Sequence, residues 1–343
     1  MARSSLSEVV DRLAALEGDL LAPTRPSSAD VFFEPVSSSA EVAFDYANTL
    51  VSPASLLFAP REEMFSVARR DDGRPEVVWD LGGPEQIIFG LRPCDVAAIA
   101  YLDHFFLGGD FADSLYAARR GRTRLIALAC EAAAHEHCFC SCCESGPVAS
   151  GGYDIQLSGT TNGYLVEVGS EAGGEIVRGF SDLLRPATAE DVAERDEAAS
   201  RLHTELSERG NMPAAIRHVT SEAVAEEVWE TIGDRCVSCG GCSLVCPKCT
   251  CFIVVDEVLD DGTISRSRCR DSCRLAGYTR EASGVNPRAE TFDRGKRFSY
   301  HKLSYRYVEQ NEVHGCVGCG RCAIVCMGGV AMPQVAQMIR KGI

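Results

Sequence analysis

Several features that would place a protein in a familiar class are missing from this sequence of 343 residues. It has no uninterrupted apolar run near the roughly 20 residues that a membrane-spanning helix needs. Its first residues, 1–8, lack the apolar core of a secretory signal. Hydrophobic residues make up 45% and charged residues 24%, which excludes disordered and collagen-like chains. We therefore expect a globular, cytoplasmic protein of about two domains with no membrane insertion.

Excess positive charge and nucleotide-binding motifs are also missing. The formal net charge is −15, whereas proteins that bind nucleic acids present a basic face. No Gly-x-Gly-x-x-Gly follows a predicted strand, and there is no P-loop, so the backbone signatures that cradle phosphates are absent. We expect no nucleic-acid partner and no nucleotide bound by this chain itself.

Cysteine is the residue that the chain has in excess, with eighteen copies. A chain of this length builds its own core without disulfide bonds, and a reducing cytosol would not keep them oxidised. Metal binding or redox chemistry is therefore the default interpretation. The cysteines are clustered, and none falls between 143 and 236.

The one internal repeat is a pair of Cys-x2-Cys-x2-Cys-x3-Cys runs, at 236–246 and 316–326. In this ferredoxin-type spacing three cysteines hold one [4Fe-4S] cluster, and the fourth ligates the other cluster. One cluster is therefore expected on Cys236, Cys239, Cys242 and Cys326, and the second on Cys316, Cys319, Cys322 and Cys246. A zinc ribbon, which uses two Cys-x2-Cys pairs, fits these quartets badly. A radical-SAM triad at 242–249 would need a barrel after it, for which too little chain remains.

Upstream of these runs the pattern predicts a parallel β–α–β unit. Buried strands are expected at 86–91 and 124–129, with a helix at 94–106 between them. A capping box at Ser5–Glu8 is expected to open a helix that reaches Leu20. The fold class is thus an α/β (α+β) N-terminal domain, followed by a mainly helical, ferredoxin-like dicluster domain.

Composition suggests three regions: an α/β domain at 1–186, a helical linker at 187–230 and the dicluster domain at 231–343. The stretch 187–230 has four Lys/Arg against eleven Asp/Glu, as in a solvated helix. The stretch 265–307 has eleven Lys/Arg against four Asp/Glu. Clusters held by four thiolates are anionic, so these cations have an electrostatic reason to lie near them.

A third cluster site is predicted in the N-terminal domain. Cys94 opens the helix after the first strand and Cys130 closes the second strand, so both lie at the carboxyl edge of the sheet, where open α/β sheets bind ligands. The next loop can fold back over that edge. The predicted ligands are Cys94, Cys130, Cys138 and Cys140. The alternative is a set of buried structural thiols, and Cys142 and Cys143 are either alternative ligands or bystanders.

A further site is less defined by its spacing. Its candidate ligands are Cys249, Cys251, Cys269 and Cys273, which follow no established metal-binding pattern. They are either a fourth cluster, a zinc site or structural thiols.

Several short motifs after Glu85 belong together. They are 90–95 (GLRPCD), 128–130 (LAC), 138–140 (CFC), 152–154 (GYD), 164–167 (YLVE), 246–252 (CPKCTCF), 271–273 (DSC), 301–302 (HK) and 316–322 (CVGCGRC). This set resembles the β-subunit family of cytosolic sulfhydrogenase-type NiFe hydrogenases, a group that also includes the related iron–sulfur subunit of anaerobic sulfite reductase. The chain departs from the family at Cys142, Cys143, Cys269 and Arg270.

The resemblance implies an iron–sulfur electron-transfer subunit without a catalytic site of its own. Its partners would be a subunit that binds flavin and NAD(P), together with a catalytic subunit, hydrogenase-like or sulfite/heterodisulfide reductase-like. The alternative is a stand-alone oxidoreductase that reduces a disulfide or polysulfide at the N-terminal cluster. A cluster-bearing nucleic-acid-binding protein would use the basic stretch 265–307, and the net charge speaks against it.

Overall fold

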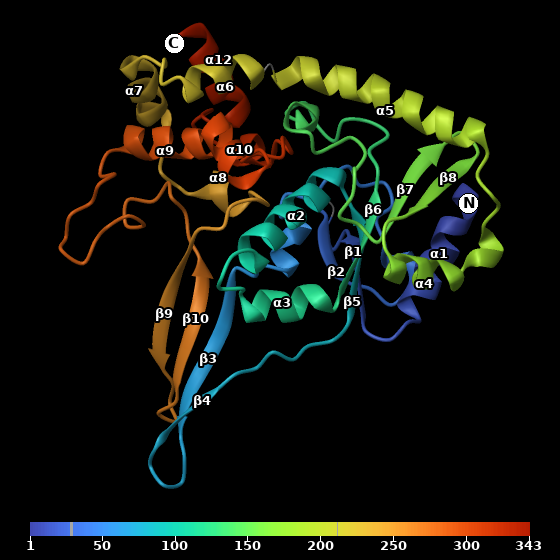
Figure 1. The fold of residues 1–343 in the computed structure, drawn as a ribbon, viewed down its shortest axis with the longest axis horizontal. Coiled ribbons are helices and arrows are strands. Elements are labelled where there is room, and N and C mark those ends of the chain that lie inside the picture. Colours follow the sequence, from blue (N-terminus) through green and yellow to red (C-terminus); the bar gives the residue numbers. More distant parts are fainter. Residues whose placement is uncertain (28–29, 211) are drawn as a thin grey trace.

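A computed structural model describes residues 1–27, 30–210 and 212–343, and its larger sheet has six strands (Figure 1). The strand order is β2-β1-β5-β6-β7-β8. The strands are β1 (Asp19–Thr24), β2 (Phe32–Pro35), β5 (Gln86–Leu91), β6 (Thr123–Leu128), β7 (Ile155–Thr160) and β8 (Gly163–Val168). The four central strands are parallel, and β2 and β8 are antiparallel edges.

The predicted β–α–β unit is confirmed. β5 and β6 are parallel neighbours, and α2 (Pro93–Leu107) follows β5 directly. Pro93 occupies the first helical position, where its missing N–H costs nothing. A second helix, α3 (Ser114–Gly121), completes the crossover.

The six-stranded sheet is covered on both faces because its side chains alternate. Ile126 and Leu128 of β6 pack on the side of α1 (Leu6–Ala14), whereas Leu125 and Ala127 pack on the side of α2. Helix α4 (Glu171–Arg178) contacts β8. The sequence of a parallel strand that is buried on both faces is a continuous apolar run, and β5 and β6 have such sequences.

The predicted helix from Ser5 to Leu20 is wrong in its extent. Helix α1 ends at Ala14, and Leu20 lies buried in β1. Gly18 has φ +104°, and a Cβ there would lie 2.2 Å from the Glu85 carbonyl oxygen, so the chain turns at a position that only glycine fits. The Ser5 side chain caps nothing.

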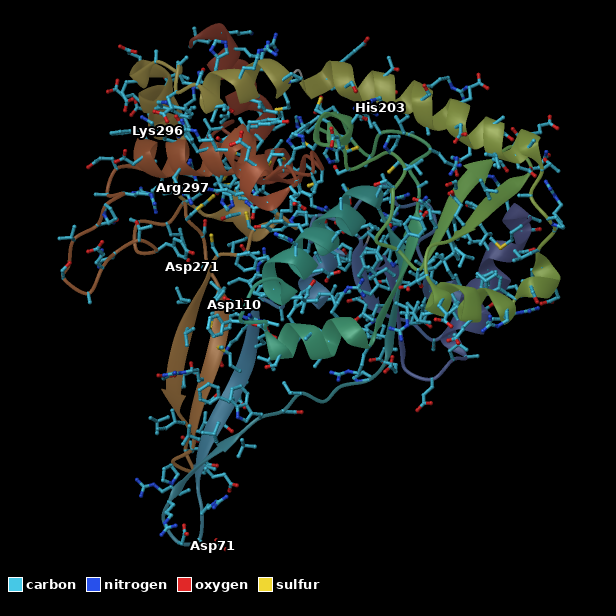
Figure 2. The ribbon with its side chains drawn as sticks, in the orientation of Figure 1. Asp71, Asp110, His203, Asp271, Lys296 and Arg297 are labelled. Atoms are coloured by element: carbon cyan, nitrogen blue, oxygen red, sulfur yellow. The ribbon has the colours of Figure 1, made fainter. Side chains whose placement is uncertain are left out.

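A second, four-stranded antiparallel sheet forms an arm that extends from the body (Figure 1). Its order is β4-β3-β10-β9. The strands are β3 (Arg61–Arg69), β4 (Pro75–Val78), β9 (Phe252–Val258) and β10 (Ile264–Arg270). Asp71 marks the outer tip of the arm (Figure 2). The sequence did not predict this sheet, which joins strands from both expected domains.

The remaining helices lie between residues 189 and 341. They are α5 (Ala189–Gly210), α6 (Met212–Thr220), α7 (Glu226–Arg235), α8 (Gly241–Leu244), α9 (Thr291–Leu303), α10 (Tyr305–Asn311), α11 (Arg321–Val325) and α12 (Met332–Lys341). Short 3-10 turns occur at Arg3–Ser5, Ser39–Glu41, Pro53–Leu56, Cys140–Cys143 and Ser181–Leu183. Trp229, Phe298 and Val335 lie in the core of the C-terminal helices. In the described ranges no helix is both long and apolar enough to cross a bilayer.

Candidate metal centres

The first predicted quartet lines one cavity. Its thiols are those of Cys236, Cys239, Cys242 and Cys326. The backbone N–H of Ser238 donates to Cys236 Sγ at 3.4 Å, and that of Val330 donates to Cys326 Sγ at 3.3 Å. Amide donors of this kind stabilise negative charge on sulfur. The structure thus brings the fourth cysteine of the second run to the loop of the first.

Arg274 supplies positive charge at this cavity. Its guanidinium donates to Cys236 Sγ at 2.8 Å, and its side chain is buried. Among the described residues no carboxylate forms an ion pair with Arg274. A buried cation needs an anionic partner, and a cluster with four thiolates would provide one. The residues around this cavity therefore fit an iron–sulfur group.

The second predicted quartet is also brought together. Its members are Cys316, Cys319, Cys322 and Cys246. Burial raises the pKa of Cys322, and the charges of its three companions raise it further, as expected of close neighbours. The Gly318 N–H donates to Cys316 Sγ at 3.3 Å. Helices α8 and α11 pack against each other. Each helix lies just before the fourth cysteine of its own run, so this packing brings that cysteine near the loop of the other run.

Lys302 is the buried cation of the second quartet. Its Nζ lies 3.4 Å from Cys246 Sγ, and within the described part of the chain it has no carboxylate partner. Burial by itself would lower the pKa of Lys302, but the charges of Cys246, Cys249 and Cys316 outweigh it and raise the pKa above its usual value. The ammonium is therefore a fixed positive charge beside these thiols, and it too fits an anionic cluster.

Replacing Lys302 by methionine is expected to lower the reduction potential of one cluster. Reduction adds negative charge, which a nearby buried cation stabilises. The measurement is an EPR-monitored redox titration of the anaerobic protein. The matched control is Lys296→Met on the same helix α9 (Figure 2). Lys296 is partly exposed and forms an ion pair with Glu226. An unchanged set of potentials in Lys302→Met, or an equal shift in Lys296→Met, would contradict the assignment.

The third predicted quartet lines a separate cavity. Cys94, Cys130, Cys138 and Cys140 all contribute to its wall, and Cys319 of the second quartet joins them. Burial raises the pKa of the Cys94 thiol, and that of Cys130 to about 11. A bound metal would displace these protons, because thiolates are the ligands.

Cys142 and Cys143 lie outside that cavity. Cys143 forms a hydrogen bond with Cys316, which raises the pKa of Cys143, as burial also does. Cys142 Sγ lies 3.4 Å from the Ser207 carbonyl oxygen on α5. Cys143 is thus a neighbour of the second quartet.

The fourth group is brought together in part. A hydrogen bond with Cys273, aided by one with Tyr278, lowers the pKa of Cys251 to about 6. Cys249 forms a hydrogen bond with Cys246. Cys269 lies in β10 opposite Ile253, and within the described residues no hydrogen bond joins it to the other three. These contacts join Cys251 to Cys273 and Cys249 to the second quartet, and the site with four cysteines stays a prediction.

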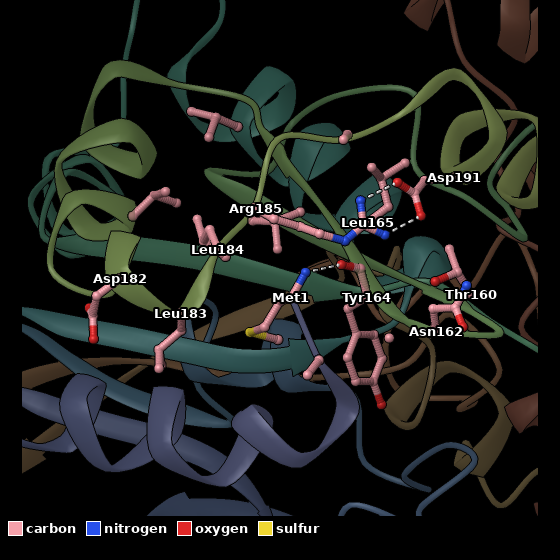
Figure 3. A pocket seen from close by; sticks show the side chains of 16 residues that line it. Met1, Thr160, Asn162, Tyr164, Leu165, Asp182, Leu183, Leu184, Arg185 and Asp191 are labelled. Atoms are coloured by element: carbon pink, nitrogen blue, oxygen red, sulfur yellow. Dashed lines mark hydrogen bonds and ion pairs between the residues drawn. The ribbon is translucent and has the colours of Figure 1, made fainter.

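A larger cavity of about 1000 Å³ contains no cysteine in its lining (Figure 3). Arg185 and Asp191 form a two-pronged ion pair at 2.7 and 2.8 Å on its wall. The amino group of Met1 donates to the Tyr164 carbonyl oxygen at 2.9 Å. The charged groups of this cavity thus form their hydrogen bonds with one another or with the backbone. None of the predicted cluster ligands lines the cavity.

The sequence analysis assigned no role to the buried cations, although Lys302 and Arg92 lie in two of the quoted motifs. Arg274 and Lys302 fall in the basic stretch 265–307, so the excess of Lys/Arg was the available signal. Arg92, which lies beside the third cavity, carried no such signal, because it stands alone in an apolar strand-to-helix junction.

Two comparisons with known proteins bear on these centres. A family model described as a 4Fe-4S dicluster domain matches residues 235–330, which contain both cysteine runs. The chain is also 29% identical, over 330 residues, to the protein named sulfhydrogenase 2 subunit beta from Pyrococcus furiosus. That alignment covers 95% of this chain and 93% of the relative.

Proposed function

Since this chain is a homologue of the hydrogenase β-subunit family and carries a 4Fe-4S dicluster domain, we propose that it relays electrons from one partner to another. One partner is a subunit that binds flavin and NAD(P), and the other is a catalytic oxidoreductase subunit. The comparisons support the family predicted from the motifs, through one relative that is 29% identical and through the dicluster match. They also support an iron–sulfur electron-transfer subunit that works with partner subunits. The finer proposal is a cytoplasmic complex whose catalytic subunit is hydrogenase-like or sulfite/heterodisulfide reductase-like.

The observation that carries the proposal is the pairing of each C-terminal quartet with a buried, carboxylate-free cation. Arg274 and Lys302 hold positive charge against the thiols, and all of those thiols except that of Cys239 are buried or half-buried. Bound [4Fe-4S] clusters supply one-electron transfer. The protein's own contribution is to fix the thiols, neutralise their charge and exclude solvent.

The two C-terminal quartets differ in their exposure to solvent. Cys239 of the first quartet is exposed, and Val237 and Met327 beside it are 59% and 82% exposed. The second quartet has no exposed cysteine. We infer that the first quartet faces the outside of this protein and that the second lies within it.

The test of the proposal compares reductants. Clusters accept single electrons, whereas NADH and NADPH deliver a hydride, so a flavin has to stand between them. The isolated chain is expected to be bleached by dithionite and to be inert to NADH and NADPH in anaerobic stopped-flow absorbance. Addition of the flavoprotein partner should restore reduction by the pyridine nucleotide.

Two results would overturn this assignment. One is rapid bleaching by NADH or NADPH without a partner, and the other is stoichiometric flavin in the pure chain. Either would favour the stand-alone oxidoreductase, as would reduction of a disulfide or polysulfide by the isolated chain.

A further inference from the structure

The cavity at the carboxyl edge of the six-stranded sheet is built from three separate segments. Cys94 comes from the first turn of α2, and Cys130 comes two residues after β6 ends. Cys138 and Cys140 come from the loop that leads into the 3-10 turn Cys140–Cys143. All four thiols line the cavity. The local fold thus brings together cysteines that are up to 46 positions apart in the sequence.

Arg92 gives this cavity an unbalanced positive charge. Its side chain is buried, and the guanidinium lies 4.3 Å from the centre of the Tyr46 ring. It donates to the carbonyl oxygens of Tyr46 and Leu128. Its buried Nε has no hydrogen-bond partner in the part of the chain that the structure describes, and no carboxylate pairs with it there. Such a group indicates an anionic partner in the cavity.

Apart from Asn48, the rest of the lining is apolar, and helix α5 closes it. Ala132, Ala133 and Ala134 form one wall. Leu202 and Leu206 of α5 are buried against Cys94, Cys138 and Cys140 in one apolar group. Water is therefore kept from the thiols. This packing gives the acidic helix a role beyond that of a solvated linker.

Four cysteine thiols are the ligand set of a [4Fe-4S] cluster. The position of this cavity beside the second quartet favours a redox cluster over a zinc ion.

The cavity adjoins the second quartet. Cys319 lines it together with the four N-terminal thiols, and the Phe139 N–H donates to the Gly318 carbonyl oxygen at 2.8 Å. Gly318 has φ +60°, and a Cβ there would lie 2.6 Å from the backbone of Cys140. The two cysteine loops are therefore in direct backbone contact.

We propose that Cys94, Cys130, Cys138 and Cys140 hold a third iron–sulfur cluster, of the [4Fe-4S] type, next to the cluster of the second quartet. Arg92 supplies its counter-charge, and α5 closes it from water. This inference rests on the proposed function only in that the chain is loaded with iron–sulfur clusters.

The experiment uses the full chain, purified and reconstituted anaerobically. Three clusters predict about 12 irons and 12 sulfides per chain, against about 8 for two. Cys94→Ser and Cys130→Ser should each lose about 4 irons and the same EPR signal of the reduced protein. Cys142→Ser, at a cysteine outside the cavity, is the matched control and should keep all the iron. Circular dichroism confirms that each variant is folded.

The outcomes separate this inference from the proposed function. About 8 irons in the parent chain, with unchanged EPR spectra in Cys94→Ser and Cys130→Ser, would overturn the third cluster and leave the electron-transfer role intact. One zinc per chain that is lost in both variants would also overturn it. About 4 irons or fewer in fully loaded protein would instead overturn the proposed function.

Discussion

Cys326→Ser is expected to abolish the cluster of the first cysteine run, although Cys326 belongs to the second run. The structure places Cys326 in the cavity of Cys236, Cys239 and Cys242. Loss of one of four thiolates exposes an iron, and the exposed cluster is expected to be released during purification. Cys246→Ser should remove the other cluster for the same reason. Each variant should lose about 4 irons and one of the reduced EPR signals.

The control for this pair is Met327→Leu, directly beside Cys326 and mostly exposed. It should keep all the iron and both signals, because it changes no ligand. The decisive comparison is between the EPR signals that the different cysteine variants lose. If Cys326→Ser removes the signal that Cys316→Ser removes, and keeps the one that Cys236→Ser removes, each run holds its own cluster and the crossed assignment is wrong.

Arg321→Met is expected to destabilise the protein strongly. Arg321 and Asp95 are 0% and 1% exposed, and their two-pronged ion pair measures 2.8 and 2.9 Å. Arg321 Nε also donates to the Thr49 carbonyl oxygen at 2.6 Å. Removal of one partner leaves a buried, uncompensated carboxylate, which costs about 3–5 kcal/mol. The ion pair joins the second cysteine run to α2. The lost stability therefore weakens the contact between the C-terminal cysteine run and the N-terminal α/β region.

The double variant Arg321→Met/Asp95→Leu is expected to recover most of that loss, because two apolar side chains can replace a buried ion pair at little cost. The measurement is the urea midpoint of the anaerobic protein, followed by cluster absorbance. Arg12→Met, which breaks the exposed pair with Asp182, is the control and should change the midpoint little. A double variant that is less stable than Arg321→Met would show that the ion pair is not the cause.

Local signals determined which parts of the fold could be predicted. The β–α–β unit was predictable because 86–91 and 124–129 are short apolar runs and Pro93 marks a helix start. The end of α1 was not, because the turn at Gly18 depends on the approach of Glu85, a distant residue. The arm was missed for a similar reason. β3 is only partly buried, and its main partner β10 lies about two hundred residues further on.

The candidate metal centres could be proposed from the sequence to the extent that ligand spacing is local. The spacing of the two runs predicted both quartets, and the rule that ligands bind at the carboxyl edge of a parallel sheet pointed to Cys94 and Cys130. The counter-charges could not be derived, because whether an arginine has a carboxylate partner depends on tertiary packing. Arg321 illustrates this limit. It occupies the position of Gly241 in the first run, and only the fold shows that its partner is Asp95.

The pairing of β3 with β10 has a consequence for biosynthesis. The ribosome releases β3 early, when only the short strand β4 is available to pair with it, and isolated two-stranded hairpins are marginal in water. The nascent polypeptide therefore carries an unpaired strand edge through most of translation, which is a site for aggregation. The arm can close only after residues 252–270 have left the ribosome.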